Sequence, residues 1–166
     1  MRKSNYDKYP STSVNGSLWE GWDAILNQIK MDLPLQNGRH VLVVECYQGV
    51  HHKELLEQLA LLPVDERVDT RDLFRSEEEI EEMTRPFLTD DRLFGRRSSF
   101  SYADFLDNSK VEAFRSRLKQ LQGVVLVYGH GAAWVADQPD TLVYADMARW
   151  EIQLRSRRHE VEGLGV

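Results

Sequence analysis

The run HVLVVE at residues 40–45 decides the fold class of this chain. It is short, rich in β-branched residues and bounded by turn residues, which is typical of a strand buried on both faces. The residues that follow predict a loop and then a helix with Leu55, Leu59 and Leu62 on one face. The core is therefore expected to begin with a strand, a loop and a helix.

Strands and helices alternate through the rest of the chain. Residues 64–74 predict a short strand that ends in aspartates. GVVLVYGHGAAWV at 123–135 predicts a second buried strand with a glycine-rich exit, and TLVYADM at 141–147 predicts a third central strand. We expect a three-layer α/β sandwich with a mostly parallel sheet of about five strands and helices on both faces.

Three Ser-x-x-Glu sequences predict helix starts as capping boxes. They begin at Ser17, Ser76 and Ser109, ahead of segments with helical character. A basic helix is predicted over residues 148–160. Residues 90–107 show no clear period and are expected to form a long loop.

The chain is expected to hold one folded domain. Residues 1–16 are polar and predict an extended arm, and residues 17–166 predict a single α/β domain. A length of 166 residues with 42% hydrophobic residues suffices for one core of ordinary size. The tail EGLGV has no compact ending, so we expect a further domain to follow in a longer protein.

Composition argues against several classes of protein. Twenty-one Lys and Arg against 27 Asp and Glu give a net charge of −6, so a nucleic-acid binder with a broad basic face is not expected. No apolar run approaches the roughly 20 residues that a membrane-spanning helix needs, so no membrane association is expected. The single cysteine, Cys46, excludes an internal disulfide and fits a reducing compartment, which predicts a cytoplasmic protein.

The loop after the first predicted strand lies where a phosphate-binding loop of the form GxxxxGK[ST] would lie. In that register Glu45 replaces the first glycine, Val50 the second, His51 the lysine and His52 the hydroxyl residue that would bind magnesium. Glu45 also brings a negative charge to the place of the pyrophosphate, which opposes binding of a nucleoside triphosphate. The loop is then either a plain connection or the site of a smaller anion.

Ligands of open parallel sheets bind beyond the carboxyl ends of the strands, so a phosphorylated ligand is expected there. Arginines of the last helix could clamp its oxygens, or they form a solvated face with ion pairs such as that of Glu151 with Arg155. The phosphate-binding candidates are Gln48, Gly49, Val50, His51, His52, Arg155, Arg157 and Arg158.

Two further positions are candidates for chemistry. Asp72, at the end of the second predicted strand, is either a base for a substrate hydroxyl or a turn former. His130 lies between Gly129 and Gly131, which either allow close approach of a ligand or relieve a tight strand exit.

The adjacent histidines suggest a metal site, but their geometry favours the interpretation without a metal. Neighbouring residues on a helix diverge by about 100°, so His51 and His52 would converge on one ion only with strain. Because the only cysteine is isolated and the histidines are scattered along the chain, no metal and no cofactor is expected in this chain.

Four segments, in this order, resemble the uridine kinase branch of the P-loop kinases. They are HVLVVECYQGVHHKELL (40–56), VDTRDLF (68–74), GVVLVYGHGAAWV (123–135) and DTLVYADMARWEIQLRSRR (140–158). The resemblance implies a P-loop-kinase-like order of strands and an arginine-bearing lid helix at the end. The chain departs from that family because it lacks GK[ST] and carries Tyr128 where the family has an acidic residue.

The whole sequence also resembles the N-terminal extension of some bacterial class I mannose-6-phosphate isomerase-like proteins. The resemblance rests on SNYDKYP, EGW, VVECYQGVHH, EEMTRPFLTDDRLFG, LVYGHGAA and YADMARWEIQLR. In those proteins a zinc-dependent cupin follows, so the resemblance implies that the isomerase chemistry and its zinc belong to a C-terminal catalytic domain. That domain would be a partner of this one.

Two functions follow from these observations. The first is a noncatalytic domain that binds a phosphorylated ligand, or that regulates or supports the catalytic domain, in a mannose-6-phosphate isomerase-like protein of sugar-phosphate metabolism. The alternative is an active sugar or nucleoside kinase of the uridine kinase type, with Asp72 as base. The missing lysine and magnesium hydroxyl favour the first.

Overall fold

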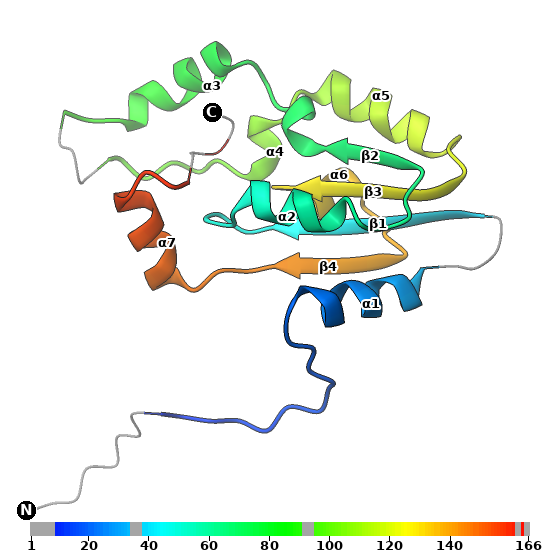
Figure 1. Ribbon diagram of the computed structural model, residues 1–166. Helices are drawn as coiled ribbons and strands as arrows, with labels where there is room; N and C mark the ends of the chain where they lie inside the picture. The colour runs from blue at the N-terminus through cyan, green and yellow to red at the C-terminus, as the bar shows by residue number, and fades with distance from the viewer. Residues whose placement is uncertain (1–8, 34–37, 91–94, 162–163, 165–166) are drawn as a thin grey trace, which may run out of the picture.

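The computed structural model describes residues 9–33, 38–90, 95–161 and 164. Its centre is a four-stranded parallel sheet with the order β2-β3-β1-β4 (Figure 1). The strands are β1 (Arg39–Cys46), β2 (Glu66–Asp69), β3 (Gly123–Gly129) and β4 (Thr141–Ala145). All four point the same way, so their carboxyl ends share one edge of the sheet, which we call the carboxyl edge.

β1 and β3 form the centre of the sheet. They pair in parallel from Arg39 opposite Gly123 to Glu45 opposite Gly129. Residues 41–44 of β1 are all buried, as expected for a strand that is covered on both faces. The prediction that these two runs are buried strands is therefore confirmed.

Helices cover both faces of the sheet, so the fold is a three-layer α/β sandwich, as predicted. One face is covered by α1 (Trp22–Asp32) and α2 (His52–Leu59). The other face is covered mainly by α5 (Asn108–Leu118) and α6 (Ala132–Val135), with contributions from the 3-10 helix η1 (Thr70–Leu73) and from α3 (Glu77–Thr84).

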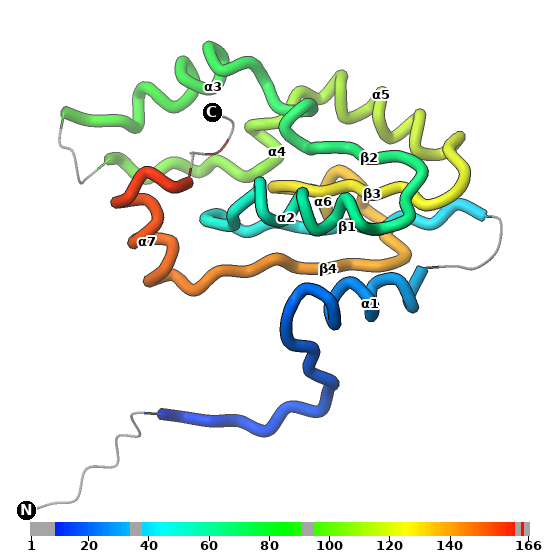
Figure 2. The backbone as a smooth tube through the Cα atoms, viewed as in Figure 1, coloured from blue at the N-terminus to red at the C-terminus, as the bar shows by residue number. Residues whose placement is uncertain are grey.

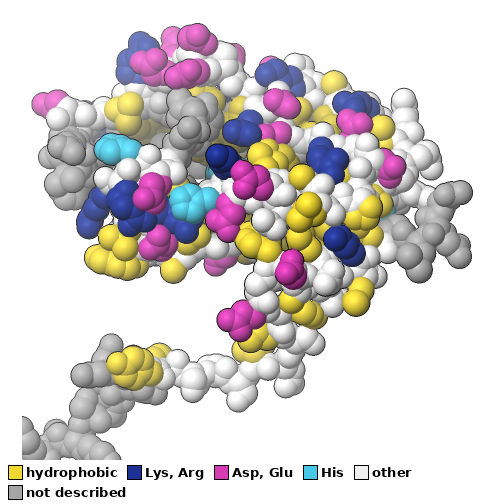
Figure 3. Space-filling view, viewed as in Figure 1, with side chains coloured by type: hydrophobic (Ala, Val, Ile, Leu, Met, Phe, Trp, Pro, Cys, Tyr) yellow, Lys and Arg dark blue, Asp and Glu magenta, His cyan; other side chains and the backbone are white. Residues whose placement is uncertain are grey.

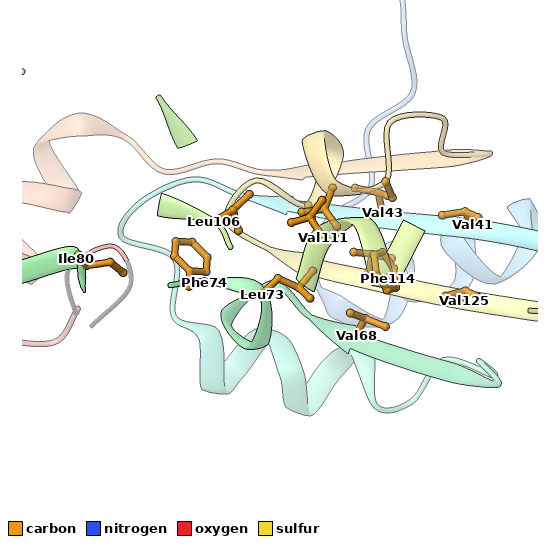
Figure 4. Close-up of a cluster of buried hydrophobic side chains, with 14 residues drawn as sticks. Val41, Val43, Val68, Leu73, Phe74, Ile80, Leu106, Val111, Phe114 and Val125 are labelled. Atoms are coloured by element: carbon orange, nitrogen blue, oxygen red, sulfur yellow. The ribbon is translucent and has the colours of Figure 1, made fainter. Parts of the chain in front are cut away.

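Side chains of the central strands alternate between the two layers of core. Val41 and Val43 of β1 point to the α5 side, where Val111 and Phe114 of that helix pack against them (Figure 4). Leu42 and its neighbours of the same parity point to the other side, toward α1 and α2. Because successive strand residues face opposite sides, HVLVVE fills both cores at once.

β4 is an edge strand rather than the predicted third central strand. It pairs with β1 from Leu42 opposite Thr141 to Cys46 opposite Ala145 and has no second neighbour among the described residues. Its side chains alternate between half-buried and exposed. An apolar run looks the same in sequence at either place, because burial depends on what packs against it. The described ranges hold four strands, whereas about five were predicted.

The capping box predicted at Ser76 is confirmed. Ser76 Oγ accepts the N–H of Glu79 (3.3 Å), and the Glu79 carboxylate accepts the N–H of Ser76 (3.0 Å) at the start of α3. The box predicted at Ser17 is wrong, because α1 begins at Trp22 with Gly21 in the N-cap position.

The start of α5 is also set by a different residue from the one predicted. The Asp107 carboxylate accepts the N–H groups of Ser109 (2.8 Å) and Lys110 (3.2 Å), so Asp107 is the cap and not Ser109. An aspartate caps as well as a serine does, and here it comes first along the chain.

The segment predicted as a long loop contains a short helix, α4 (Tyr102–Phe105). A capping box of Ser101 with Asp104 begins it, and this box has Asp in place of the Glu of the usual pattern. A 3-10 turn, η2 (Arg85–Phe87), precedes the segment, and residues 91–94 lie outside the described ranges.

In Figures 1 and 2 the segment that precedes α1 extends away from the sheet. Of the predicted arm, residues 9–16 are exposed and form neither helix nor strand, and residues 1–8 lie outside the described part. The predicted basic helix is observed as α7 (Arg149–Arg157). None of the helices in the described ranges is long and apolar enough to cross a membrane.

Candidate functional site at the carboxyl edge of the sheet

The Glu45 carboxylate, at the end of β1, accepts hydrogen bonds from the backbone at the start of α6. One of its oxygens accepts the N–H of Gly131 (2.8 Å), and the other accepts the N–H of Ala133 (2.7 Å). Backbone N–H groups at the start of a helix are the donors that bind external anions in many proteins. In this domain an internal carboxylate already occupies these donors.

Two histidines from distant parts of the sequence meet beside Glu45. His52 is the first residue of α2 and His130 follows β3, and their Nε2 atoms are 3.3 Å apart. The His130 ring also donates from Nδ1 to the carbonyl oxygen of Cys46 (2.8 Å). This bond assigns the proton of the neutral ring to Nδ1, so that Nε2 of His130 presents a lone pair toward His52.

The ring of Tyr102 in α4 lies near the His130 ring and almost parallel to it. The interplanar angle is 10° and the centroids are 6.4 Å apart. Burial raises the pKa of Tyr102, and the nearby Glu45 carboxylate raises it further. Tyr102 thus brings a neutral hydroxyl to the neighbourhood of the Glu45 carboxylate and the His130 imidazole.

The loop after β1 is a tight turn and not an open phosphate cradle. The N–H of Val50 donates to the carbonyl of Tyr47 (3.4 Å), and Gly49 has a φ of +95°. A Cβ at Gly49 would come within 2.9 Å of Ile152 of α7, and the Arg155 guanidinium donates to the Gly49 carbonyl (2.7 Å). Only glycine fits this conformation and this close approach, and α7 thereby covers the turn.

A second polar cluster lies where β2 ends beside β3. The Asp69 carboxylate accepts hydrogen bonds from the Arg71 guanidinium (2.6 and 2.8 Å) and from the hydroxyl of Tyr128. Burial raises the pKa of Asp69, but the hydrogen bonds from Arg71 and Tyr128 outweigh it and hold the pKa below its ordinary value. Burial and the neighbouring Asp69 carboxylate raise the pKa of Tyr128.

Asp72, the predicted candidate base, lies outside this cluster. It is exposed in η1, and it makes no hydrogen bond or ion pair with the described residues. Asp69 is the aspartate that serves the turn, because its carboxylate also accepts the N–H of Arg71 (2.9 Å). Asp69 and Tyr128 are functional candidates that the sequence analysis did not single out, although they lie opposite each other in the β2–β3 register.

The two glycines around His130 have different structural tasks. Gly129 has a φ of +122°, and a Cβ there would overlap the Thr70 hydroxyl. The N–H of Gly131 donates to Glu45. Contacts within the domain therefore account for both glycines as residues of a tight strand exit.

The predicted phosphate-binding residues lie in different surroundings. Gly49 and Val50 belong to the tight turn, and His52 faces His130. Arg155 bonds Glu151 as well as Gly49, and Arg158 bonds Glu160 and Glu151, so both guanidinium groups have internal partners. Gln48 and Arg157 are exposed, and His51 is half-buried at the N-cap of α2. Figure 3 shows Lys and Arg side chains interspersed with Asp and Glu on this face of the molecule, beside histidines.

A family model described as "Domain of unknown function (DUF8485)" matches residues 21–166. The chain belongs to the DUF8485 family. The match includes all strands and helices described above, so the two histidines and both polar clusters are part of the DUF8485 domain. No curated protein and no solved structure shows significant similarity to the chain.

Proposed function

We propose that this DUF8485 domain is a noncatalytic domain that binds a phosphorylated small molecule, or regulates its neighbour, in a sugar-phosphate isomerase of the mannose-6-phosphate isomerase type. The proposal that the domain is noncatalytic rests on one observation. The groups at the carboxyl edge that would bind ATP are already hydrogen-bonded within the domain. Glu45 occupies the N–H groups of Gly131 and Ala133, and Arg155 is bound to the Gly49 carbonyl. Phosphoryl transfer depends on positioning and charge, and these groups are already committed.

Polyphosphate binding is disfavoured for a second reason. A kinase of this type needs a fixed cation on the β- and γ-phosphates and a hydroxyl that binds magnesium. The turn after β1 has no lysine, and His51 and His52 stand in those two places. The Glu45 carboxylate adds a negative charge that repels a triphosphate.

A single phosphate has a smaller requirement, and α2 supports it. The first N–H groups of a helix have no acceptor within the helix, and they attract anions together with the helix dipole. His51 lies at that end of α2, and Arg157 is an exposed arginine without a hydrogen bond or ion pair to described residues. These features support a weak, salt-sensitive site for a phosphate ester.

The expected partner is the catalytic domain that the sequence resemblance implies. That domain would carry the isomerase reaction and its zinc, and the DUF8485 domain would bind ligand beside it or support it. We propose a cytoplasmic location because the chain has a single cysteine, Cys46, which is free and buried in the core.

Titration followed by amide chemical shifts tests the binding proposal. Mannose 6-phosphate, fructose 6-phosphate, nucleoside monophosphates and inorganic phosphate are added to the labelled chain at low salt. We expect at least one of the esters to shift residues 48–54, and we expect Arg157→Ala or His51→Ala to weaken binding. Lys119→Ala, at the opposite edge of the sheet, is the matched control. If none of the probes shifts these residues, the ligand-binding part is wrong and a supporting role remains.

Turnover measurements test the noncatalytic part separately. We expect no magnesium-dependent transfer of phosphate from ATP to a sugar or nucleoside. Sustained transfer that is lost in Asp72→Asn would show instead that the domain is an active kinase.

A further inference from the structure

We infer that the segment before α1 in one copy of this chain pairs as an added strand with the outer edge of β4 in a second copy, and that two copies exchange these segments reciprocally. Residues 10–20 are called the leading segment below. The inference goes beyond the proposed function, which concerns ligands at the carboxyl edge. It rests on two exposed features of the described chain, an edge strand and the leading segment.

The outer edge of β4 is the first feature. Among the described strands, β4 pairs with β1 only. The Ala145 carbonyl accepts the N–H of Tyr47 (2.9 Å), so it points toward β1. Because the backbone groups of successive strand residues point to opposite edges, those of Leu142 and Tyr144 point to the outer edge. Such a row of N–H and C=O groups is a template for pairing with another strand.

The composition of β4 does not protect this edge. Proteins often place lysine or proline in an edge strand to prevent pairing. Residues 141–145 contain only Thr, Leu, Val, Tyr and Ala. Leu142 and Tyr144 are also 56% and 55% exposed. The strand therefore offers both backbone groups and an apolar surface to a partner.

The leading segment has the sequence pattern of a strand. Residues 11–18 read STSVNGSL, in which Thr12, Val14 and Leu18 alternate with small polar residues. This alternation is typical of a strand with one apolar face. Every residue of the leading segment is exposed, with Val14 at 84% and Leu18 at 92%. Pairing with β4 would remove apolar side chains of both strands from water.

The direction of the leading segment favours a second copy over its own domain. Gly21 is the N-cap of α1 and has a φ of +81°, which residues other than glycine rarely adopt. From there the leading segment extends away from the sheet in Figures 1 and 2. Residues 11–18 would reach about 27 Å when extended, whereas β4 spans about 17 Å. Reciprocal exchange gives a closed dimer with two-fold symmetry.

Charge favours the leading segment over direct pairing of two β4 strands. Residues 10–19 and residues 141–145 hold no charged side chain, in a chain with a net charge of −6. In an antiparallel β4 pair centred on Val143, Asp140 of each copy would lie opposite Asp146 of the other. Like charges in directly opposite positions are destabilising. The neutral leading segment avoids this repulsion.

Sedimentation of the full chain from micromolar to millimolar concentration tests the inference. We expect a reversible dimer that dissociates at low micromolar concentration, because the leading segment must be ordered on pairing. Leu18→Asp in the leading segment and Leu142→Pro, which removes an N–H at the outer edge of β4, should each weaken dimerisation by about tenfold or more. Leu61→Asp is the control, because Leu61 follows α2 and is 61% exposed, and it should leave dimerisation unchanged.

Mixing two variants shows which part of each copy is used. Labelled Leu18→Asp keeps an intact β4, and unlabelled Leu142→Pro keeps an intact leading segment. We expect the amide resonances of residues 141–145 to shift in this mixture, and not when the unlabelled chain also carries Leu18→Asp. Because Leu142→Pro could disturb the fold, unlabelled Tyr144→Lys repeats the mixture with a partner that keeps all N–H groups of β4.

Several outcomes would overturn the inference. It is wrong if the unmodified chain stays monomeric at millimolar concentration, if Leu18→Asp leaves dimerisation unchanged, or if neither mixture shifts residues 141–145. Loss of dimerisation in Leu142→Pro alone would instead indicate direct pairing of two β4 strands. Protection of β4 amides that depends on Leu18 in a monomeric chain would show that the leading segment pairs with its own domain.

Discussion

β1 and β4 are neighbouring strands of similar composition, yet they are held in different ways. Residues 41–44 of β1 are fully buried between two layers of helices. β4 uses Val143 and Ala145 to pack against one core, whereas Leu142 is 56% and Tyr144 55% exposed on the other side. Apolar composition alone therefore does not show which strand is central, and the helices that cover a strand decide it.

The same contrast extends to what each strand carries at its carboxyl end. β1 ends in Glu45, whose two oxygens are bonded to backbone N–H groups, and this carboxylate is fixed. β4 leads into α7, which has no fully buried residue and contacts the turn after β1 through Ile152 and Arg155. The central strand β1 therefore fixes a polar side chain, whereas the edge strand β4 leads into a helix that is held by few contacts.

Matched Leu→Ala substitutions in the two strands give the largest expected effect. Leu42 of β1 is 0% exposed, so Leu42→Ala should lower the free energy of unfolding by about 2–5 kcal/mol through lost burial and a cavity. Leu142→Ala on β4 should change it by less than about 0.5–1 kcal/mol. Urea unfolding measures both. Equal losses would show that β4 is covered in solution and that the comparison fails.

Removing the charge of Glu45 should give the next largest effect. In Glu45→Gln one oxygen still accepts an N–H, but the amide NH₂ faces the other donor, so about 2 kcal/mol of stability should be lost. Glu57→Gln on the exposed side of α2 is the control and should be neutral. Amide exchange at Gly131 and Ala133 should accelerate in Glu45→Gln only. Unchanged exchange there would contradict the assigned capping role of Glu45.

Much of the fold could be predicted because it depends on local patterns. HVLVVE and GVVLVYG can be recognised as buried strands from their β-branched residues, and Ser76 with Glu79 marks a helix start by itself. The edge position of β4 could not be predicted, because it depends on which helices cover each face. The cap of α5 was misassigned because Asp107 and Ser109 are both good caps and lie two residues apart.

Less of the candidate site could be predicted, for a related reason. The sequence places Glu45 and His130 at strand ends, but the pairing of His52 with His130 depends on β1 lying beside β3. Asp69 and Asp72 were both visible as aspartates after a strand. Which of them serves the turn depends on the residue at which β2 ends, and that boundary is set by pairing with β3.

The Asp69 cluster at the outer strand β2 should give a smaller, pH-dependent effect. The folded-state pKa of Asp69 lies below its ordinary value of 3.8, so its contribution is complete above that value and is lost as the pH falls through the folded pKa. Asp69→Asn should therefore cost about 1 kcal/mol near pH 7, and this cost should shrink progressively as the pH falls below 3.8. Urea unfolding as a function of pH, with exposed Asp72→Asn as control, measures it. A cost that does not change with pH would show that packing, and not charge, is responsible.

Loosening α7 should give the smallest effect on global stability and the clearest local one. Arg155 donates to the Gly49 carbonyl at 2.7 Å and to Glu151 at 3.1 Å, and its side chain is 15% exposed. Since α7 buries no residue fully, Arg155→Ala should lower the free energy of unfolding by about 1 kcal/mol or less. Amide exchange in α7 should rise markedly, because the helix loses the hydrogen bond from Arg155 to the turn. Exchange in β1 and β3 should not change, because the backbone hydrogen bonds between these strands remain. Arg157→Ala, two residues along the same helix, should leave exchange unchanged. Equal protection of α7 in Arg155→Ala and the unmodified chain would mean that Ile152 against Gly49 holds the helix by itself.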